Sequence, residues 1–130
     1  MGSKRELVQG YLEKAQGRNR VARHLLEREE WDDAVSRAYY AAYHAGQAAL
    51  VTEGQRAETP RGLITLFGLL LVRTGKFEKR WGKFLANLKD DRETSHYEAL
   101  SWIDEVTARR AVKEAEAFVE AVCRYVAKLA

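Results

Sequence analysis

The sequence predicts an all-α protein, folded as an antiparallel up-and-down bundle of four to five helices. Only one proline occurs in the 130 residues, and the glycines fall mostly where predicted helices end. Apolar residues recur at steps of three and four, with no strand-like alternation of polar and apolar positions. The predicted connections are short, which makes consecutive helices neighbours that run in opposite directions.

The first two predicted helices cover residues 3–29 and 32–53. A serine begins the first, because its hydroxyl and Glu6, three residues later, form a capping-box pattern. The second ends before Gly54, a residue that suits the left-handed conformation found after helices. Residues 54–58 are then the longest predicted loop.

The remaining three helices are predicted at 60–73, 77–91 and 107–129. Thr59 is a good N-cap for the third helix, and a proline follows it at the first helical position. The fourth carries a single apolar stripe, and an irregular stretch follows it. Thr107 is the expected cap of the fifth helix, whose apolar stripe requires a partner helix.

Composition indicates a single helical domain over residues 1–130. Twenty-two Lys and Arg against 19 Asp and Glu give a net charge of +3, a mixed balance that permits nucleic acid as a partner without demanding it. The lone Cys123 excludes an intramolecular disulfide and is compatible with a reducing cytoplasm, where we expect the protein. The longest apolar run, 63–72, is about half a membrane span, so we expect no membrane association. Scarce Asn, Gln, Met and Cys favour a thermophilic source.

The third helix is apolar around most of its circumference and must be covered on several sides. In a small bundle, a second subunit can supply part of that cover. We therefore predict a homodimer, with helices 32–53 and 60–73 as the main contributors.

The segment SRAYYAAYHAG, residues 36–46, concentrates polar tips among small residues. Arg37, Tyr40 and His44 fall within roughly 60° of one another on a helix, while Tyr39 and Tyr43 share a neighbouring strip. One interpretation is a central helix whose tyrosine hydroxyls are satisfied by hydrogen bonds. The other is a nucleotide site, in which the arginine binds phosphate, the tyrosine stacks on a base and the histidine carries a proton.

Four segments together carry a resemblance to a known family. They are WDDAVSRAYYAAYHAGQAAL at 31–50, TPRGLITLFGLLLVRTGKF at 59–77, LKDDRETSHY at 88–97 and EAFVEAVCRYV at 116–126. In this order they resemble the HEPN family of small all-α proteins, over residues from about 10 to 127. The resemblance is closest to an uncharacterised prokaryotic branch with the SRAYYAxxHA segment.

This resemblance implies a dimeric helical bundle that is often encoded beside a minimal nucleotidyltransferase, with which it forms a toxin and antitoxin pair. The chain would then be an interaction or nucleotide-binding module. Some HEPN members are instead metal-independent ribonucleases, in which an Arg and a His from each protomer meet at the dimer cleft.

The corresponding candidates for catalysis here are Arg92, His96 and Tyr97. Only three residues separate the arginine from the histidine, whereas the family motif has four to six. On a helix this spacing still places both on one face, so Arg92 could hold a phosphate while His96 exchanges a proton. Arg37 and His44 have the family spacing but lie on another helix, where we interpret the match as coincidental for catalysis.

Other chemistries lack the residues they need. The sequence has a single Glu-x-x-His, at Glu93 and His96, where a di-iron bundle needs two on separate helices. It has no His and Cys cluster with metal-ligand spacing and no glycine-rich phosphate loop, so we expect neither metal nor cofactor. A basic strip on the fourth helix is either a solvated face or a surface for RNA or a partner. It consists of Lys76, Lys79, Arg80 and Lys83.

Overall fold

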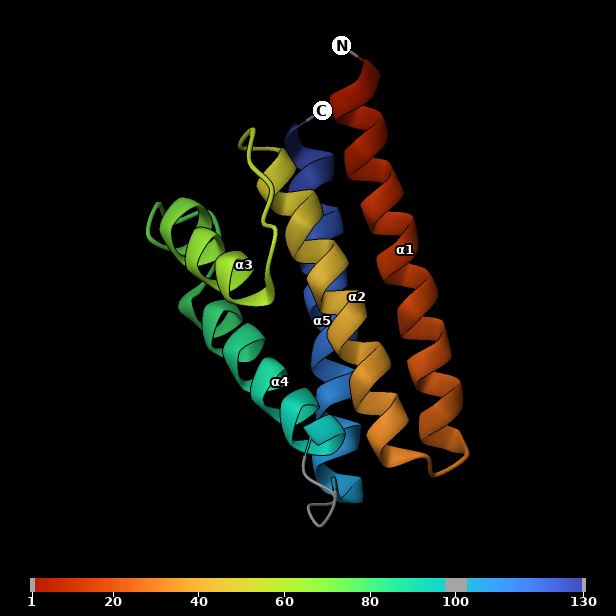
Figure 1. The fold of residues 1–130 in the computed structure, drawn as a ribbon. Coiled ribbons are helices and arrows are strands. Elements are labelled where there is room, and N and C mark those ends of the chain that lie inside the picture. Colours follow the sequence, from red (N-terminus) through yellow and green to blue (C-terminus); the bar gives the residue numbers. More distant parts are fainter. Residues whose placement is uncertain (1, 98–102, 130) are drawn as a thin grey trace.

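The computed structural model describes residues 2–97 and 103–129, with the backbone alone for 94–97. Within these ranges the chain forms five α-helices and no strand, so the predicted all-α bundle is confirmed (Figure 1). A π-helical turn, η1, directly continues the third helix. The elements are α1 (Gly2–Glu27), α2 (Trp31–Val51), α3 (Pro60–Phe67), η1 (Gly68–Val72), α4 (Lys79–Tyr97) and α5 (Glu105–Leu129).

Helix α2 lies at the centre of the bundle and packs against α1, α3, α4 and α5 (Figure 1). Small side chains allow this close approach, because an alanine methyl group fills little of the space between two helix axes. Seven alanines of α2 are almost completely buried: Ala34, Ala38, Ala41, Ala42, Ala45, Ala48 and Ala49.

Polar contacts align α1 with α5. The Asn19 side chain donates to the backbone oxygen of Ala115 at 3.5 Å, and Arg23 Nε donates to Glu116 at 3.2 Å. Because these bonds are directional, they select one register between two helices whose apolar faces alone would tolerate several.

An aromatic cluster attaches the α3–α4 arm to the rest of the bundle. The ring of Phe118 on α5 lies 5.6 Å from Phe67 of α3, 5.4 Å from Trp81 and 5.6 Å from Phe84, both on α4. Phe118 and Phe67 are completely buried. The arm is therefore held by edge and tilted ring contacts, which aromatic pairs prefer.

The predicted stop after the second helix and the predicted cap of the third are confirmed, whereas the cap of the fifth is wrong. Gly54 has φ +75°, and Thr59 Oγ1 accepts the Gly62 N–H at 2.9 Å. However, α5 begins at Glu105, and Asp104 Oδ1 caps it by accepting the Thr107 N–H at 2.8 Å. Asp is as good a cap as Thr, so the helix begins directly after Asp104, three residues before the predicted cap.

Helix α4 is also longer than predicted. The apolar stripe ends at Leu88, which placed the end of the helix near Asp91, but the backbone remains helical through Tyr97. Polar residues sustain this last part of the helix, as in the ion pair between Lys89 and Glu93 at 2.7 Å.

Gln47 fixes the loop between α2 and α3. Its side-chain amide donates to the Ala57 carbonyl at 2.7 Å and accepts the Ala57 N–H at 2.9 Å. Gln47 is 4% exposed, so both backbone groups of Ala57 find their partner in a buried side chain. The loop therefore places Thr59 and Pro60 against α2.

Replacing this amide should destabilise the fold. Gln47→Ala leaves a buried N–H and a buried C=O without partners, which we expect to lower the free energy of unfolding by about 1–3 kcal/mol. Urea denaturation followed by circular dichroism measures the change. Gln55→Ala, an exposed glutamine of the same loop, serves as the control and should change stability by less than about 0.5 kcal/mol. Equal losses in both variants would contradict the role assigned to Gln47.

Candidate functional site

Tyrosines of α2 meet an arginine of α4 along one side of the bundle. Arg92 Nη2 donates to the Tyr40 hydroxyl at 2.9 Å. The Arg92 guanidinium carbon also lies 4.9 Å from the centre of the Tyr39 ring and 5.2 Å from that of Tyr40. Two phenol rings and one hydroxyl therefore hold the cation in place, by cation–π attraction and a hydrogen bond.

A cavity of about 140 Å³ opens beside this arginine. Tyr39, Tyr40, Tyr43, Pro60 and Arg92 line it. A cavity of about 150 Å³ can accommodate a benzene ring, so the space suits one planar six-membered ring. We call this cavity and its rim the tyrosine groove.

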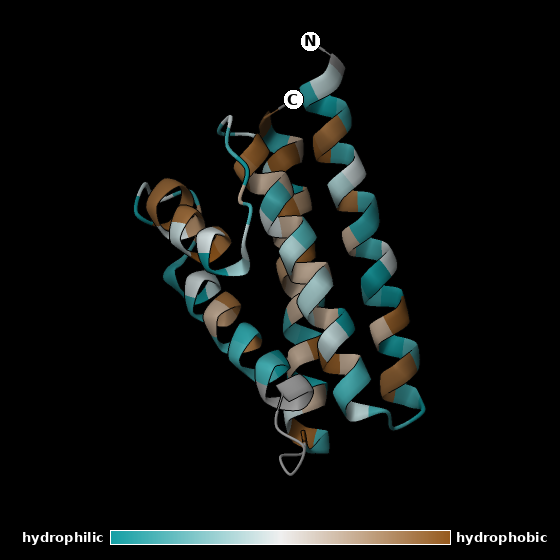
Figure 2. Cartoon of the chain, viewed as in Figure 1, coloured by the Kyte–Doolittle hydropathy of each residue, from teal (hydrophilic) through white to brown (hydrophobic). Residues whose placement is uncertain are grey.

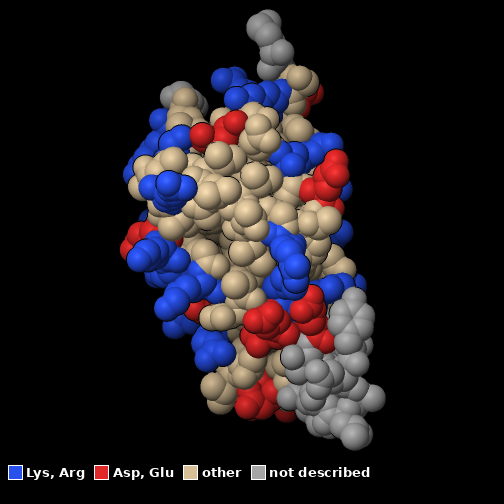
Figure 3. All heavy atoms as spheres, turned by 60° about the vertical axis from the view of Figure 1, so that its left-hand side comes forward, with Lys and Arg blue, Asp and Glu red and all other residues tan. Residues whose placement is uncertain are grey.

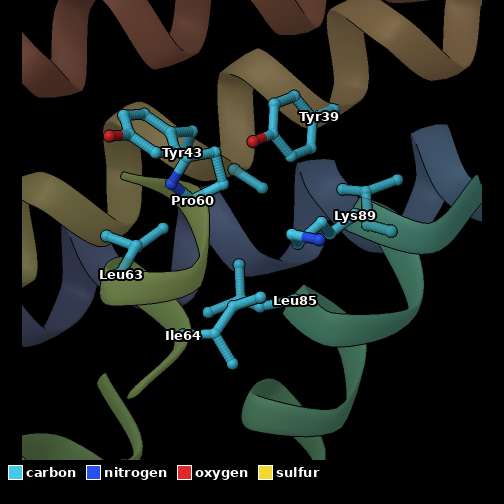
Figure 4. Close-up of a pocket in the computed structure, with 9 residues that line it drawn as sticks. Tyr39, Tyr43, Pro60, Leu63, Ile64, Leu85 and Lys89 are labelled. Carbon is cyan, nitrogen blue, oxygen red and sulfur yellow. The ribbon is translucent and has the colours of Figure 1, made fainter. Parts of the chain in front are cut away.

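A smaller and largely apolar pocket shares Tyr39, Tyr43 and Pro60 with the tyrosine groove (Figure 4). Tyr39 and Tyr43 lie side by side there, and Ile64 and Leu85 lie on the other side of the pocket. The space inside it is about 10 Å³, which is too small for a ligand. This second pocket therefore packs the tyrosine rings and does not extend the binding space.

Burial keeps the tyrosines protonated. It raises the pKa of Tyr39 to about 12, although the neighbouring Arg92 opposes that shift, and burial also raises the pKa of Tyr43. Both phenols are therefore neutral at physiological pH. They can donate hydrogen bonds and present ring faces without repelling an anion.

Arg37, Tyr40 and His44 share one face of α2, but the structure gives the three side chains different neighbours. Arg37 is exposed, and Tyr40 contacts Arg92. The His44 ring stacks on Tyr11 of α1, with 6.1 Å between ring centres. No contact joins all three in the described part of the chain, and a nucleotide site built from them stays a prediction.

The environment of His44 disfavours the charged form of its imidazole ring. Its Nδ1 is buried, with no hydrogen-bond partner in the described part of the chain. Burial lowers the pKa of His44, and the positive charges of Lys14 and Arg18 lower it further. The ring is therefore a neutral packing element between α1 and α2.

The catalytic candidates lie on the last two turns of α4. Because the backbone is helical through Tyr97, positions 92 and 96 are one turn apart on one helix face. Arg92 is described and reaches the tyrosine groove. The side chains of His96 and Tyr97 lie outside the described residues.

Sequence reasoning did not assign Tyr39, Tyr43 or Pro60 to a site. The four-residue spacing of the two tyrosines indicated a shared strip, but not what faces it. Only the packing of α2 against α4 pairs that strip with Arg92.

Metal ligands do not gather among the described side chains, those of residues 2–93 and 103–129. No group of three or more His, Cys, Asp or Glu residues there is placed to hold a metal ion. None of the helices described is long and apolar enough to cross a membrane.

An all-α bundle with a cationic and aromatic site between two of its helices defines a small helical-bundle domain with a candidate binding groove. Residues 8–126 match the HEPN domain, and the chain belongs to the HEPN family. The predicted family membership is thus confirmed over nearly the whole chain.

Relatives in two organisms cover almost the full length. A protein of Methanocaldococcus jannaschii named "Putative toxin" is 32% identical over 118 residues, which are 91% of this chain and 87% of that protein. A UPF0332 protein of Thermotoga maritima is 29% identical over 122 residues, 94% of this chain and 92% of its own. Among solved structures, TT1696 from Thermus thermophilus superimposes with a TM-score of 0.76. It shares 18% identity over 91% of this chain and 97% of that one, which shows a shared fold.

The neutral state of His44 predicts a pH-dependent stability. Its folded pKa lies below the unfolded value of about 6.5, so the unfolded chain binds the proton first as the pH falls. The free energy of unfolding should therefore decline below about pH 6.5, and His44→Phe should flatten that decline. Urea titrations at three pH values, about 7.5, 6 and 5, measure it. The exposed His24, changed to Gln, is the matched control and should keep the wild-type slope; an unchanged slope in His44→Phe would refute this account.

Proposed function

We propose that this chain is a toxin-type HEPN module that binds RNA, or a nucleotide, in the tyrosine groove. The observation that carries the proposal is the Arg92 guanidinium, held by Tyr39 and Tyr40 at the mouth of a ring-sized cavity. The toxin class is supported by membership of the HEPN family and by the names of two relatives from M. jannaschii.

The chemistry of the groove matches a nucleotide in two parts. An arginine fork recognises phosphate oxygens through two parallel N–H donors, and its geometry is better defined when aromatic rings fix the guanidinium plane. A base fits the cavity by stacking against phenol faces, as single-stranded nucleic acids do on aromatic side chains. In this role Arg92 binds phosphate, while Tyr39 and Tyr40 orient it.

The module acts as a homodimer in this proposal. The outer strip of α3 and η1 is apolar, as the brown segments of Figure 2 indicate, and Leu69 is 47% exposed there. Figure 3 views the side that carries α3 and α4, where uncharged surface occupies the middle and most Lys and Arg lie toward the edges. An apolar centre with a charged rim is typical of protein interfaces.

A minimal nucleotidyltransferase is the proposed partner of the dimer, on the basis of the family resemblance. Such an enzyme would bind the module as its antitoxin.

A mass measurement tests the dimer. Light scattering at micromolar concentration should give twice the 14.8 kDa of the chain. Leu69→Glu should shift the mass toward the monomer, because an unpaired carboxylate is costly in an apolar contact. A monomeric mass for the unchanged protein would refute the dimer.

A second candidate function is metal-independent RNA cleavage, favoured by the helical backbone between positions 92 and 96. His96 would remove the proton of a 2′-hydroxyl, whose oxygen attacks the adjacent phosphorus and expels the 5′-oxygen of the next nucleotide. Arg92 would stabilise the pentavalent phosphate. The products are a 2′,3′-cyclic phosphate and a free 5′-hydroxyl.

One RNA experiment tests both functions. End-labelled single-stranded RNA is mixed with wild type, Arg92→Ala and His96→Ala in EDTA, with binding read by anisotropy and cleavage on a gel. We expect Arg92→Ala to weaken binding about tenfold to a hundredfold, since a charge-assisted hydrogen bond contributes about 1.5–3 kcal/mol. Arg20→Ala, a change at an exposed arginine of α1, should bind as wild type.

The outcomes separate the two functions. Unchanged binding in Arg92→Ala would refute the tyrosine groove as the RNA site. Cleavage by wild type but not by His96→Ala would establish the second candidate, and equal cleavage by both would remove His96 from the mechanism. Binding without cleavage by any variant would leave the module non-catalytic.

A further inference from the structure

We propose that a second groove, at the other end of α4, binds the backbone of single-stranded RNA. It lies between the start of α4 and the last turns of α5 and has a volume of about 460 Å³. We call it the basic groove. Its lining includes the cationic and aromatic side chains of Lys76, Arg80, Trp81, Arg124, Tyr125 and Lys128.

Positive charge exceeds negative charge at the basic groove. Four cations line it against a single lining carboxylate, that of Glu78. Glu53 pairs with Lys76 at 2.7 Å and Glu120 with Arg124, so four cations meet three carboxylates. The exposed Lys79 and Lys83 extend the same positive strip along α4. A polyanion is therefore attracted to this groove.

The ion pairs of the two arginines are weak enough to be exchanged. Arg80 lies 3.4 Å from Glu78, and Arg124 lies 3.5 Å from Glu120 on its own helix. The four side chains of these pairs are between 66% and 73% exposed, and such surface pairs contribute about 0–1 kcal/mol. A phosphate can replace each carboxylate at little cost.

The planar side chains of the basic groove favour RNA over an acidic peptide as its ligand. The Arg80 guanidinium lies 4.3 Å from the centre of the Trp81 ring, and most of this arginine remains open to solvent. Tyr125 packs on Phe77 at 4.8 Å between ring centres and is partly exposed. Guanidinium planes and aromatic rings are the platforms on which unpaired bases stack, whereas carboxylates need only charge.

The basic groove is separate from the tyrosine groove. Arg80 and Arg92 are twelve residues apart on α4, which corresponds to about 18 Å along the axis and about 120° around it. The proposal therefore does not depend on Arg92, and separate variants test the two grooves.

The test uses a fluorescein-labelled oligouridylate of about 12 nucleotides, within the size range of single-strand sites. Anisotropy titrations compare wild type with the double variant Arg80→Glu, Lys128→Glu. The matched control, Arg20→Glu with Lys113→Glu, makes the same change of charge at exposed positions of α1 and α5 outside the groove. We expect binding to weaken about tenfold or more in the groove variant, but only about twofold in the control.

Two further measurements identify the occupant. In the double variant Arg80→Gln, Lys128→Gln, the slope of the logarithm of the binding constant against the logarithm of the salt concentration should become shallower by about 1.4. Each lost phosphate contact contributes about 0.7 to this slope on a single strand. Arg80→Lys should weaken binding despite its retained charge, because lysine has no plane for stacking.

Several results would overturn the proposal. Equal loss in the groove and control variants would show attraction to overall charge alone. Displacement of the RNA by polyglutamate at equal concentration of negative charge would assign the groove to an acidic protein instead. If Arg92→Ala loses binding and the basic-groove variants keep it, the basic groove is refuted and the tyrosine groove is supported. If the basic-groove variants lose binding and Arg92→Ala keeps it, the tyrosine groove is refuted and the basic groove is supported.

Discussion

The close packing of α2 against four neighbouring helices is the constraint on which the rest of the structure depends. Its buried face is largely alanine, so backbones approach closely and little volume is left for larger side chains. The tyrosines and the histidine of α2 lie beside this alanine face. Tyr39, Tyr40 and Tyr43 meet α4 and the α2–α3 loop there, and His44 meets α1. The site thus arises from the same arrangement that makes α2 the core helix.

Helix α4 connects the two cationic regions. Its first half is fixed to α5 through the aromatic contacts of Phe118, and its second half presents Arg92 to the tyrosines of α2. One helix therefore carries a partly buried arginine toward one end and exposed cations at the other. The first environment favours a defined, oriented contact with one phosphate, and the second favours exchangeable contacts with a chain of phosphates.

Membership of the HEPN family sets the class of this chain, and the toxin role is the proposal that the names of two relatives support. The structure adds which surfaces of this chain are candidates for binding a ligand. The tyrosine groove combines neutral phenols with one held cation, and in the proposed function a base and a phosphate bind there together. Its tyrosines come from the segment 36–46. In that segment Arg37 and His44 have the spacing of the family motif, but they have different neighbours in the structure.

The sequence by itself determined the helical class, the order of the five helices and the family, because periodic apolar positions, caps and glycine stops are local signals. Thr59 and Gly54 are examples in which the local rule was sufficient. The end of α4 was not predictable from its apolar stripe, since polar side chains sustain the helix beyond that stripe. Only the tertiary structure decided which residues form the candidate site. Arg92 and Tyr40 are 52 positions apart, and no local pattern encodes which flank of α2 faces α4. That choice depends on the combined packing of the alanine face, the Gln47 amide and the Phe118 cluster.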